Sequence, residues 1–84
     1  MRTLTELGQT LAEHRKRLGL RQGLVATQAG LTQESLSRFE RGRLAELGAR
    51  KLLALLAVLG LELSFTEAGS SGSLDELRRE RGKA

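Results

Sequence analysis

Polar side chains with varied hydrogen-bonding groups gather in one short stretch, Gly30–Arg43. Thr32 is a favourable N-cap for a helix in this stretch, and Gly42 is a natural stop. Helical spacing turns one set of side chains away from the apolar face, namely Gln33, Glu34, Ser37, Arg38 and Arg41. Amides, hydroxyls and guanidiniums are groups that read base edges in the major groove of DNA. The stretch therefore predicts a short helix that carries reading groups.

The opposite face of that helix holds two apolar residues and one acid, Leu36, Phe39 and Glu40. Arg15 projects from the apolar side of an earlier helix by the same spacing argument. A buried charge without a partner is costly, so we expect Arg15 and Glu40 to form a structural salt bridge that sets the angle of the reading helix. An acid–base site is the alternative, but no nucleophile accompanies the pair.

Two helices precede the reading helix. Thr3 and Glu6 fit a capping box, and the helix that follows should run to about Leu18. Its apolar side is formed by Leu4, Leu7, Leu11 and Leu18, and His14 is expected to be solvated. The second helix should span Leu20–Ala29, with Leu24, Val25 and Ala29 facing inward.

The start of the second helix is weak. Arg21 stands where a capping residue is expected, and Gly23 lies in the first turn. Gln22 is suited to a phosphate, since a helix N-terminus attracts anions, or it is a plain surface residue. The second helix, the turn at Gly30 and the reading helix together predict a helix-turn-helix.

The region after Gly42 predicts contact with a second copy of the chain. Residues Ala45–Leu59 read as an apolar helix with two stripes, and Leu53 and Ala57 begin the second stripe. Leu61–Thr66 then alternates apolar and polar residues, which is the only strand signal. A lone strand would pair with its copy across a two-fold axis, through a face containing Leu61, Leu63 and Phe65. An irregular extended tail is the alternative.

Composition limits the class of protein. The chain has 84 residues, a net charge of +4 and no Cys, which suits one small domain over 1–67. Residues 68–84 read as a flexible linker and charged tail, with a short helix capped by Ser73. We expect no metal, no cofactor and no catalysis, and a cytoplasmic, nucleoid-associated protein without a membrane span. With Phe39 and Phe65 as the only aromatics, base stacking on single strands is disfavoured.

The pattern also resembles a known family. It includes Arg15, Leu18-Gly19-Leu20-x-Gln22, Ala29-Gly30-Leu31-Thr32-Gln33, Leu36-Ser37 and Glu40-x-Gly42, and is similar to the Cro/repressor-type (XRE) helix-turn-helix. Leu59–Thr66 resembles the strand that follows the fourth helix in HipB-type antitoxins. Arg21 and Gly23, at the start of the second helix, and the acid Glu34 depart from the usual family pattern.

This resemblance implies a mainly α, lambda-repressor-like bundle of four to five helices, whose C-terminal strand pairs across a homodimer on a palindromic operator. Base reading would fall to Gln33, Glu34, Ser37 and Arg38, and backbone contact to Gln22, Thr32, Arg41 and Arg43. Glu34 would accept from a cytosine amino group or repel phosphate. The implied function is a repressor and type II antitoxin that autoregulates its operon and binds a HipA-like serine/threonine kinase toxin.

Two other functions remain open at this point. The chain could be a stand-alone XRE-type regulator, because such a protein would share nearly all of the pattern up to Gly60. It could also be a protein-interaction module that does not bind DNA. The polar donors on the reading helix disfavour the second alternative, because protein-binding faces are richer in exposed apolar and aromatic side chains.

Overall fold

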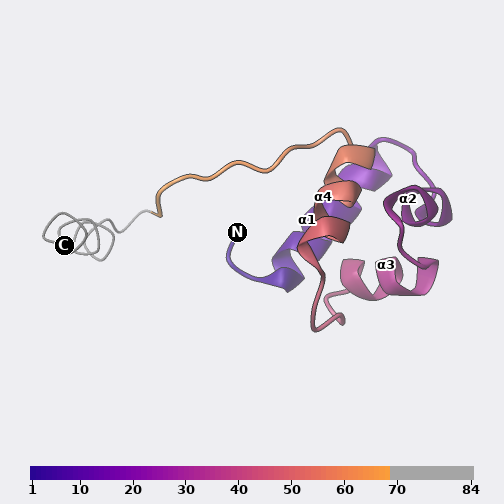
Figure 1. The fold of residues 1–84 in the computed structure, drawn as a ribbon, viewed down its shortest axis with the longest axis horizontal. Helices are drawn as coiled ribbons and strands as arrows, with labels where there is room; N and C mark the ends of the chain where they lie inside the picture. The colour runs from indigo at the N-terminus through magenta and orange to yellow at the C-terminus, as the bar shows by residue number, and fades with distance from the viewer. Residues whose placement is uncertain (69–84) are drawn as a thin grey trace, which may run out of the picture.

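The computed structural model describes residues 1–68, and within them the chain forms four helices and no strand (Figure 1). The helices are α1 (Leu4–Arg17), α2 (Gln22–Ala29), α3 (Gln33–Glu40) and α4 (Ala49–Val58). α1 packs against α3, and α2 packs against both α3 and α4. α2 and α3 follow each other through a tight turn and cross rather than run parallel (Figure 1). This arrangement confirms the predicted helix-turn-helix within a mainly α fold.

Capping residues fix where the first and third helices begin. The Thr3 hydroxyl accepts from the backbone N–H of Glu6 at 3.0 Å, and the Thr32 hydroxyl accepts from that of Ser35 at 3.0 Å. α2 ends at Ala29 and is capped by Gly30, whose φ of 76° lies in the left-handed region, so a side chain there would be strained. The Leu31 N–H then donates to the Ala26 carbonyl at 2.8 Å, which satisfies one of the last carbonyls of α2.

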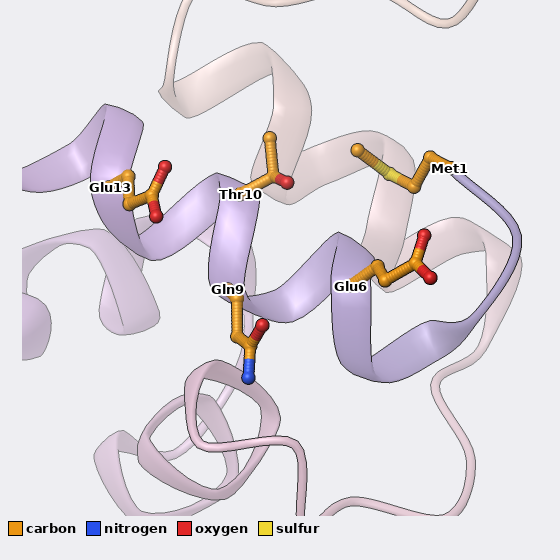
Figure 2. Close-up of a pocket in the computed structure, with 5 residues that line it drawn as sticks. All are labelled: Met1, Glu6, Gln9, Thr10 and Glu13. Atoms are coloured by element: carbon orange, nitrogen blue, oxygen red, sulfur yellow. The ribbon is translucent and has the colours of Figure 1, made fainter.

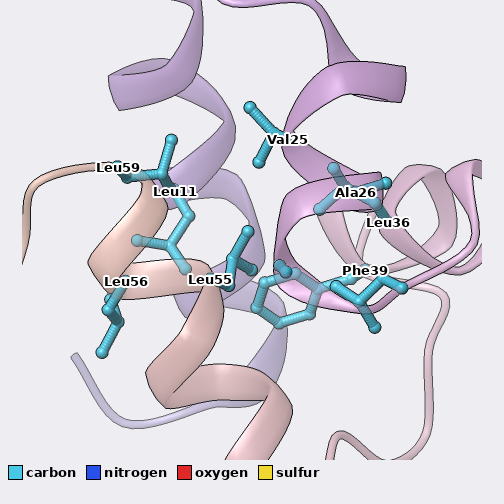
Figure 3. Packing of buried hydrophobic residues seen from close by; sticks show 10 residues of the cluster. Leu11, Val25, Ala26, Leu36, Phe39, Leu55, Leu56 and Leu59 are labelled. Atoms are coloured by element: carbon cyan, nitrogen blue, oxygen red, sulfur yellow. The ribbon is translucent and has the colours of Figure 1, made fainter.

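The core takes its largest fully buried side chains from three helices: Phe39 and Leu36 of α3, Leu55 of α4 and Val25 of α2. Figure 3 shows these side chains meeting Leu11 of α1 between the helices. Apolar burial contributes about 1.5–3 kcal/mol for each such side chain. Leu36 and Phe39 therefore anchor α3 by its inner face, as its sequence predicts.

Four expectations about helix bounds and faces are wrong. Leu18, expected on the apolar side of the first helix, is 50% exposed. α4 begins at Ala49 rather than Ala45, because Leu47 packs on the core from the loop before the helix and not from the helix itself. α2 begins at Gln22 rather than Leu20. Leu24 is 50% exposed, since Val25, Ala26 and Ala29 occupy the inner face of its helix.

Residues 61–68 form no strand in the single chain. Leu61 packs on the core, and the segment then continues in extended form away from α4 (Figure 1). The alternative prediction, an irregular extended tail, agrees with the structure of this segment. Strand pairing needs a second chain to supply backbone partners, so it stays a prediction. The predicted linker and the short helix capped by Ser73 lie outside the described residues.

α1 crosses α3 at very close range. A Cβ placed on Gly8 would overlap the backbone carbonyl oxygen of Phe39. A carbonyl in a helix end cannot move as a flexible side chain can, so any larger residue at this position would push the two helices apart. Gly8 therefore sets the separation at which the rest of the α1–α3 contact forms.

The predicted salt bridge lies at this contact. Arg15 Nε donates to Glu40 Oε2 at 2.6 Å, and its Nη2 donates to Oε1 at 2.8 Å. The two side chains are only 11% and 7% exposed. Arg15 Nη1 donates to the Leu20 carbonyl at 2.8 Å, and Gln22 Nε2 donates to Glu40 Oε1 at 3.0 Å. One bidentate pair thus joins α1, the α1–α2 turn, the start of α2 and the end of α3.

The ionisation of Arg15 agrees with that geometry. Its hydrogen bond to Glu40 raises the pKa of Arg15 above the ordinary value, with the Glu40 charge acting in the same direction and burial opposing both. A raised pKa on a basic group gives stability that is fully present below its unfolded-state pKa. The Arg15 contribution is therefore complete at neutral pH and is lost only as pH rises through that raised, strongly alkaline pKa.

His14 differs from its expected role as a solvated residue. Its Nε2 lies 3.1 Å from the Leu59 carbonyl, and the side chain is partly buried. Since a carbonyl only accepts, Nε2 carries the proton, and Nδ1 faces the guanidinium of Arg17 at 3.5 Å. His14 therefore ties α1 to the residue that ends α4, a contact that spacing within one helix does not reveal.

We expect Arg15 and Glu40 to be strongly coupled in stability. Arg15→Met or Glu40→Gln alone leaves a buried group without its partner and should lower the free energy of unfolding by about 3–5 kcal/mol. The double variant should cost clearly less than the sum, as measured by urea unfolding.

The exposed pair Glu34 and Arg38, with the same ion types at 2.7 Å, provides the matched control. Its cycle should give only about 0.3–0.5 kcal/mol of coupling. Additive costs for Arg15→Met and Glu40→Gln would contradict the structural role of the buried pair.

Candidate nucleic-acid interface

The outer face of α3 carries the four residues predicted to read bases. Gln33, Glu34 and Arg38 are exposed, and Ser37 is partly buried. The helix is held from behind by Leu36, Phe39 and the Arg15–Glu40 pair. α3 therefore presents amide, hydroxyl, carboxylate and guanidinium groups on a backbone that is fixed at both ends.

Two of these residues are paired with each other. Arg38 Nη2 donates to Glu34 Oε1 at 2.7 Å, with side chains 54% and 72% exposed. The sequence interpretation treated them as separate readers. Their spacing of four residues, with the acid first, is the signal that could have indicated the pair.

Gln33 lies against the first turn of α2. A Cβ on Gly23 would come within 3.2 Å of Gln33 Oε1. The lack of a side chain at Gly23 therefore admits the Gln33 amide between the two helices of the motif. This gives a reason for a glycine where a helix former would be more stable.

The N-terminus of α2 suits an anion. It has no side-chain cap and no acidic residue in its first turn, so its first N–H groups are available to a phosphate. Gln22 stands at this end, but one of its amide N–H groups is given to Glu40. The second N–H remains for the predicted phosphate contact.

The other predicted backbone contacts differ in their freedom. The Thr32 hydroxyl donates to Ser35 Oγ at 2.9 Å while capping α3, so a phosphate contact requires it to rotate. Arg41 Nε donates to the Ser37 carbonyl at 3.3 Å, and the Arg41 side chain is exposed, so its terminal guanidinium nitrogens are accessible to a phosphate. Arg43 is exposed just after Gly42, whose turn is closed by a 2.8 Å bond from the Arg43 N–H to the Arg38 carbonyl.

One basic surface was missed from the sequence. Arg50 and Lys51 are exposed in the first turn of α4, a helix that also begins without a side-chain cap or an acid. The residues looked like mid-helix positions because the helix was predicted to start at Ala45. Recognising Gly48 as the N-cap of α4 would have indicated a second helix N-terminus suited to phosphate.

The outer face of α1 has the opposite character. An open depression of about 310 Å³ lies there, lined by Met1, Glu6, Gln9, Thr10 and Glu13 (Figure 2). Two carboxylates and no basic side chain line it, so a polyanion is disfavoured on this side.

The described residues hold no group of three or more His, Asp or Glu side chains suited to a metal ion. None of their helices has the length and apolar character needed to cross a membrane.

The residues predicted to dimerise are mostly uncovered. Leu53 is 52% exposed, Leu63 is 51% exposed and Phe65 is 89% exposed. Ala57 is also exposed. Leu61 is the exception, because it is partly buried against the chain's own core.

Comparison with known proteins assigns the family. The search of curated proteins gave no match to this chain. Residues 6–68 match the family model described as a helix-turn-helix domain. The match begins in the first turn of α1 and includes the other three helices and the whole candidate interface. Such a domain suggests a DNA-binding regulator. The chain thus belongs to the helix-turn-helix domain family.

Proposed function

We propose that this protein is a sequence-specific, double-stranded-DNA-binding repressor whose α3 lies in the major groove. The observation that carries the proposal is α3 itself. Its inner face is fixed by the buried Arg15–Glu40 pair, and its outer face exposes polar reading groups. Base reading falls to Gln33, Glu34, Ser37 and Arg38, with the Arg38 guanidinium and the Gln33 amide contacting purine edges.

Backbone contacts would hold α3 in register. Arg41 and Arg43 follow the reading helix, and Gln22 stands at the uncapped start of α2. Such contacts supply affinity and orientation without sequence information. Arg50 and Lys51 are further candidates for the same role, whereas the acidic face of α1 would point away from DNA.

A homodimer would complete the site. Leu63 and Phe65 line an open, mainly apolar groove of about 410 Å³ together with residues of the N-terminal segment and α1, including Leu4 and Leu7. Exposed apolar side chains of this size favour burial against another surface. A second copy would cover them and supply a strand partner for residues 61–66, so the operator would be palindromic, with half-sites about 34 Å apart.

The biological setting we propose is that of a type II antitoxin which represses its own operon and binds a HipA-like kinase toxin. This part rests on the resemblance of Leu59–Thr66 to HipB-type chains. A stand-alone XRE-type regulator is the alternative, and co-purification with the product of the adjacent gene distinguishes the two. No catalytic role is proposed. If the protein were an interaction module that does not bind DNA, the measurement described next would show no binding to the duplex.

The protein should bind duplex DNA with an affinity that falls steeply as salt rises. Fluorescence anisotropy with a labelled duplex from upstream of its own gene measures this. Arg43→Ala should make the negative slope of log K against log[salt] shallower by about 0.9 for each phosphate that the side chain no longer neutralises. Lys16→Ala, which removes the same charge from the exposed face of α1 that carries Glu13, should leave the slope unchanged. Binding that does not respond to salt would contradict the proposal.

Gly23→Ala should separate stability from recognition. Alanine is favoured over glycine inside a helix by roughly 0.8–1 kcal/mol, and the atom it would press, Gln33 Oε1, ends a flexible exposed side chain. We expect a higher melting temperature together with weaker or altered operator binding, since Gln33 is displaced.

The matched control for Gly23→Ala is Thr27→Ala, an exposed substitution later in α2. It should leave operator binding unchanged. Unaltered sequence preference in Gly23→Ala would show that the position of Gln33 does not matter for recognition.

A further inference from the structure

The pair formed by Glu34 and Arg38 has a chemistry that neither residue has alone. A carboxylate is an unusual group on a surface that meets a polyanion, because phosphates repel it. Here the charge is matched by Arg38, whose Nη2 lies 2.7 Å from Glu34 Oε1. The pair is therefore neutral as a whole, and the electrostatic cost of Glu34 near DNA is reduced.

Both members keep groups free for a ligand. Arg38 uses one N–H of Nη2 on Glu34, which leaves the remaining guanidinium N–H groups as donors. Glu34 uses Oε1 and retains Oε2 as an acceptor. With side chains 54% and 72% exposed, the pair presents donors beside an acceptor at the outer surface of α3.

A G·C base pair matches this arrangement best. Across the major groove a G·C pair shows two acceptors, guanine N7 and O6, followed by one donor, the cytosine N4 amino group. An A·T pair places a donor between two acceptors, so its adenine amino group would meet the guanidinium and its thymine O4 would meet the carboxylate. In the opposite orientation, T·A offers thymine O4 to the guanidinium and the adenine amino group to the carboxylate, but the second guanidinium N–H then faces the thymine methyl group. The guanidinium–carboxylate pair thus fits G·C best, because only guanine gives the guanidinium two acceptors.

The spacing within the pair agrees with this match. Guanine O6 and cytosine N4 are joined by a hydrogen bond, for which a separation of about 2.9 Å is typical. The Arg38 nitrogen and Glu34 oxygen are 2.7 Å apart. The Arg38 nitrogen can therefore face guanine O6 while the Glu34 carboxylate faces cytosine N4.

We infer that Glu34 and Arg38 act as one reading unit for a single G·C base pair, with Arg38 on the guanine and Glu34 on the cytosine. The inference rests on the proposed function and deepens it, because it names the base pair that these two positions recognise. It also assigns Glu34 a positive role in specificity. Its carboxylate accepts a hydrogen bond from the cytosine amino group, whereas phosphate, thymine O4 and the major-groove edge of guanine offer it no donor.

The test selects duplexes from a randomised DNA library with the wild-type protein, Glu34→Ala, Arg38→Ala and the double variant. Affinities are then measured for the wild-type consensus and for the same duplex with A·T or T·A replacing G·C at one position. The wild-type protein should select G·C there in each half-site and prefer it by about tenfold or more, as expected for a bidentate base contact. Each single variant should lose this preference at that same position, and the double variant should lose no more.

Glu13→Ala is the control, because it removes an equal exposed charge from the acidic face of α1. It should keep the G·C preference, and circular dichroism should show that all variants are folded. The inference is overturned if Glu34→Ala retains the preference, or if Glu34→Ala and Arg38→Ala alter different positions. A wild-type selection without any sequence preference overturns the proposed function itself, and the inference falls with it.

Discussion

The bidentate contact between Arg15 and Glu40 is the interaction on which the arrangement of the helices depends. A small domain of this size has few large side chains with which to fix the relative angle of its helices. The contact joins α1 to the end of α3, and the same guanidinium and carboxylate reach the Leu20 carbonyl and Gln22. Because both charges are nearly buried, any displacement of α3 would leave them unsatisfied, and this penalty favours a single orientation of the outer face.

Close backbone approach makes that contact geometrically attainable. Gly8 lets α1 lie directly on the carbonyl of Phe39, and Phe39 and Leu36 fill the space behind α3. The polar residues on the outer face carry little of the folding energy, since Gln33, Glu34 and Arg38 are exposed and Ser37 is only partly buried. They are consequently free to serve recognition, and Glu34 and Arg38 use this freedom to neutralise each other while keeping groups available to bases.

Local signals in the sequence predict most of this architecture. Thr3, Thr32 and Gly30 act through groups only a few residues away, so the ends that they define agree with the structure. The Arg15–Glu40 pair was also predictable, because two charges on apolar faces within one small core have few other partners. In contrast, the start of α4 was misplaced, since Leu47 packs on the core from a loop and so resembles a residue on the apolar face of the helix.

Contacts between distant parts of the chain account for the other misses. The His14 bond to the Leu59 carbonyl depends on how α1 meets α4, and the space left by Gly23 depends on where Gln33 lies. Neither is encoded in a local pattern. The strand predicted for Leu61–Thr66 needs a second chain to form, which one chain cannot display.

The central claim is that α3, fixed by its buried ion pair, is the surface that meets DNA. Amide chemical-shift mapping by NMR during titration with duplex DNA tests it most directly. The account predicts the largest shifts at residues 33–38 and at the start of α2, with little change on the acidic face of α1 around Glu6 and Glu13. Shifts concentrated on that α1 face, or on residues 61–68 alone, would contradict it.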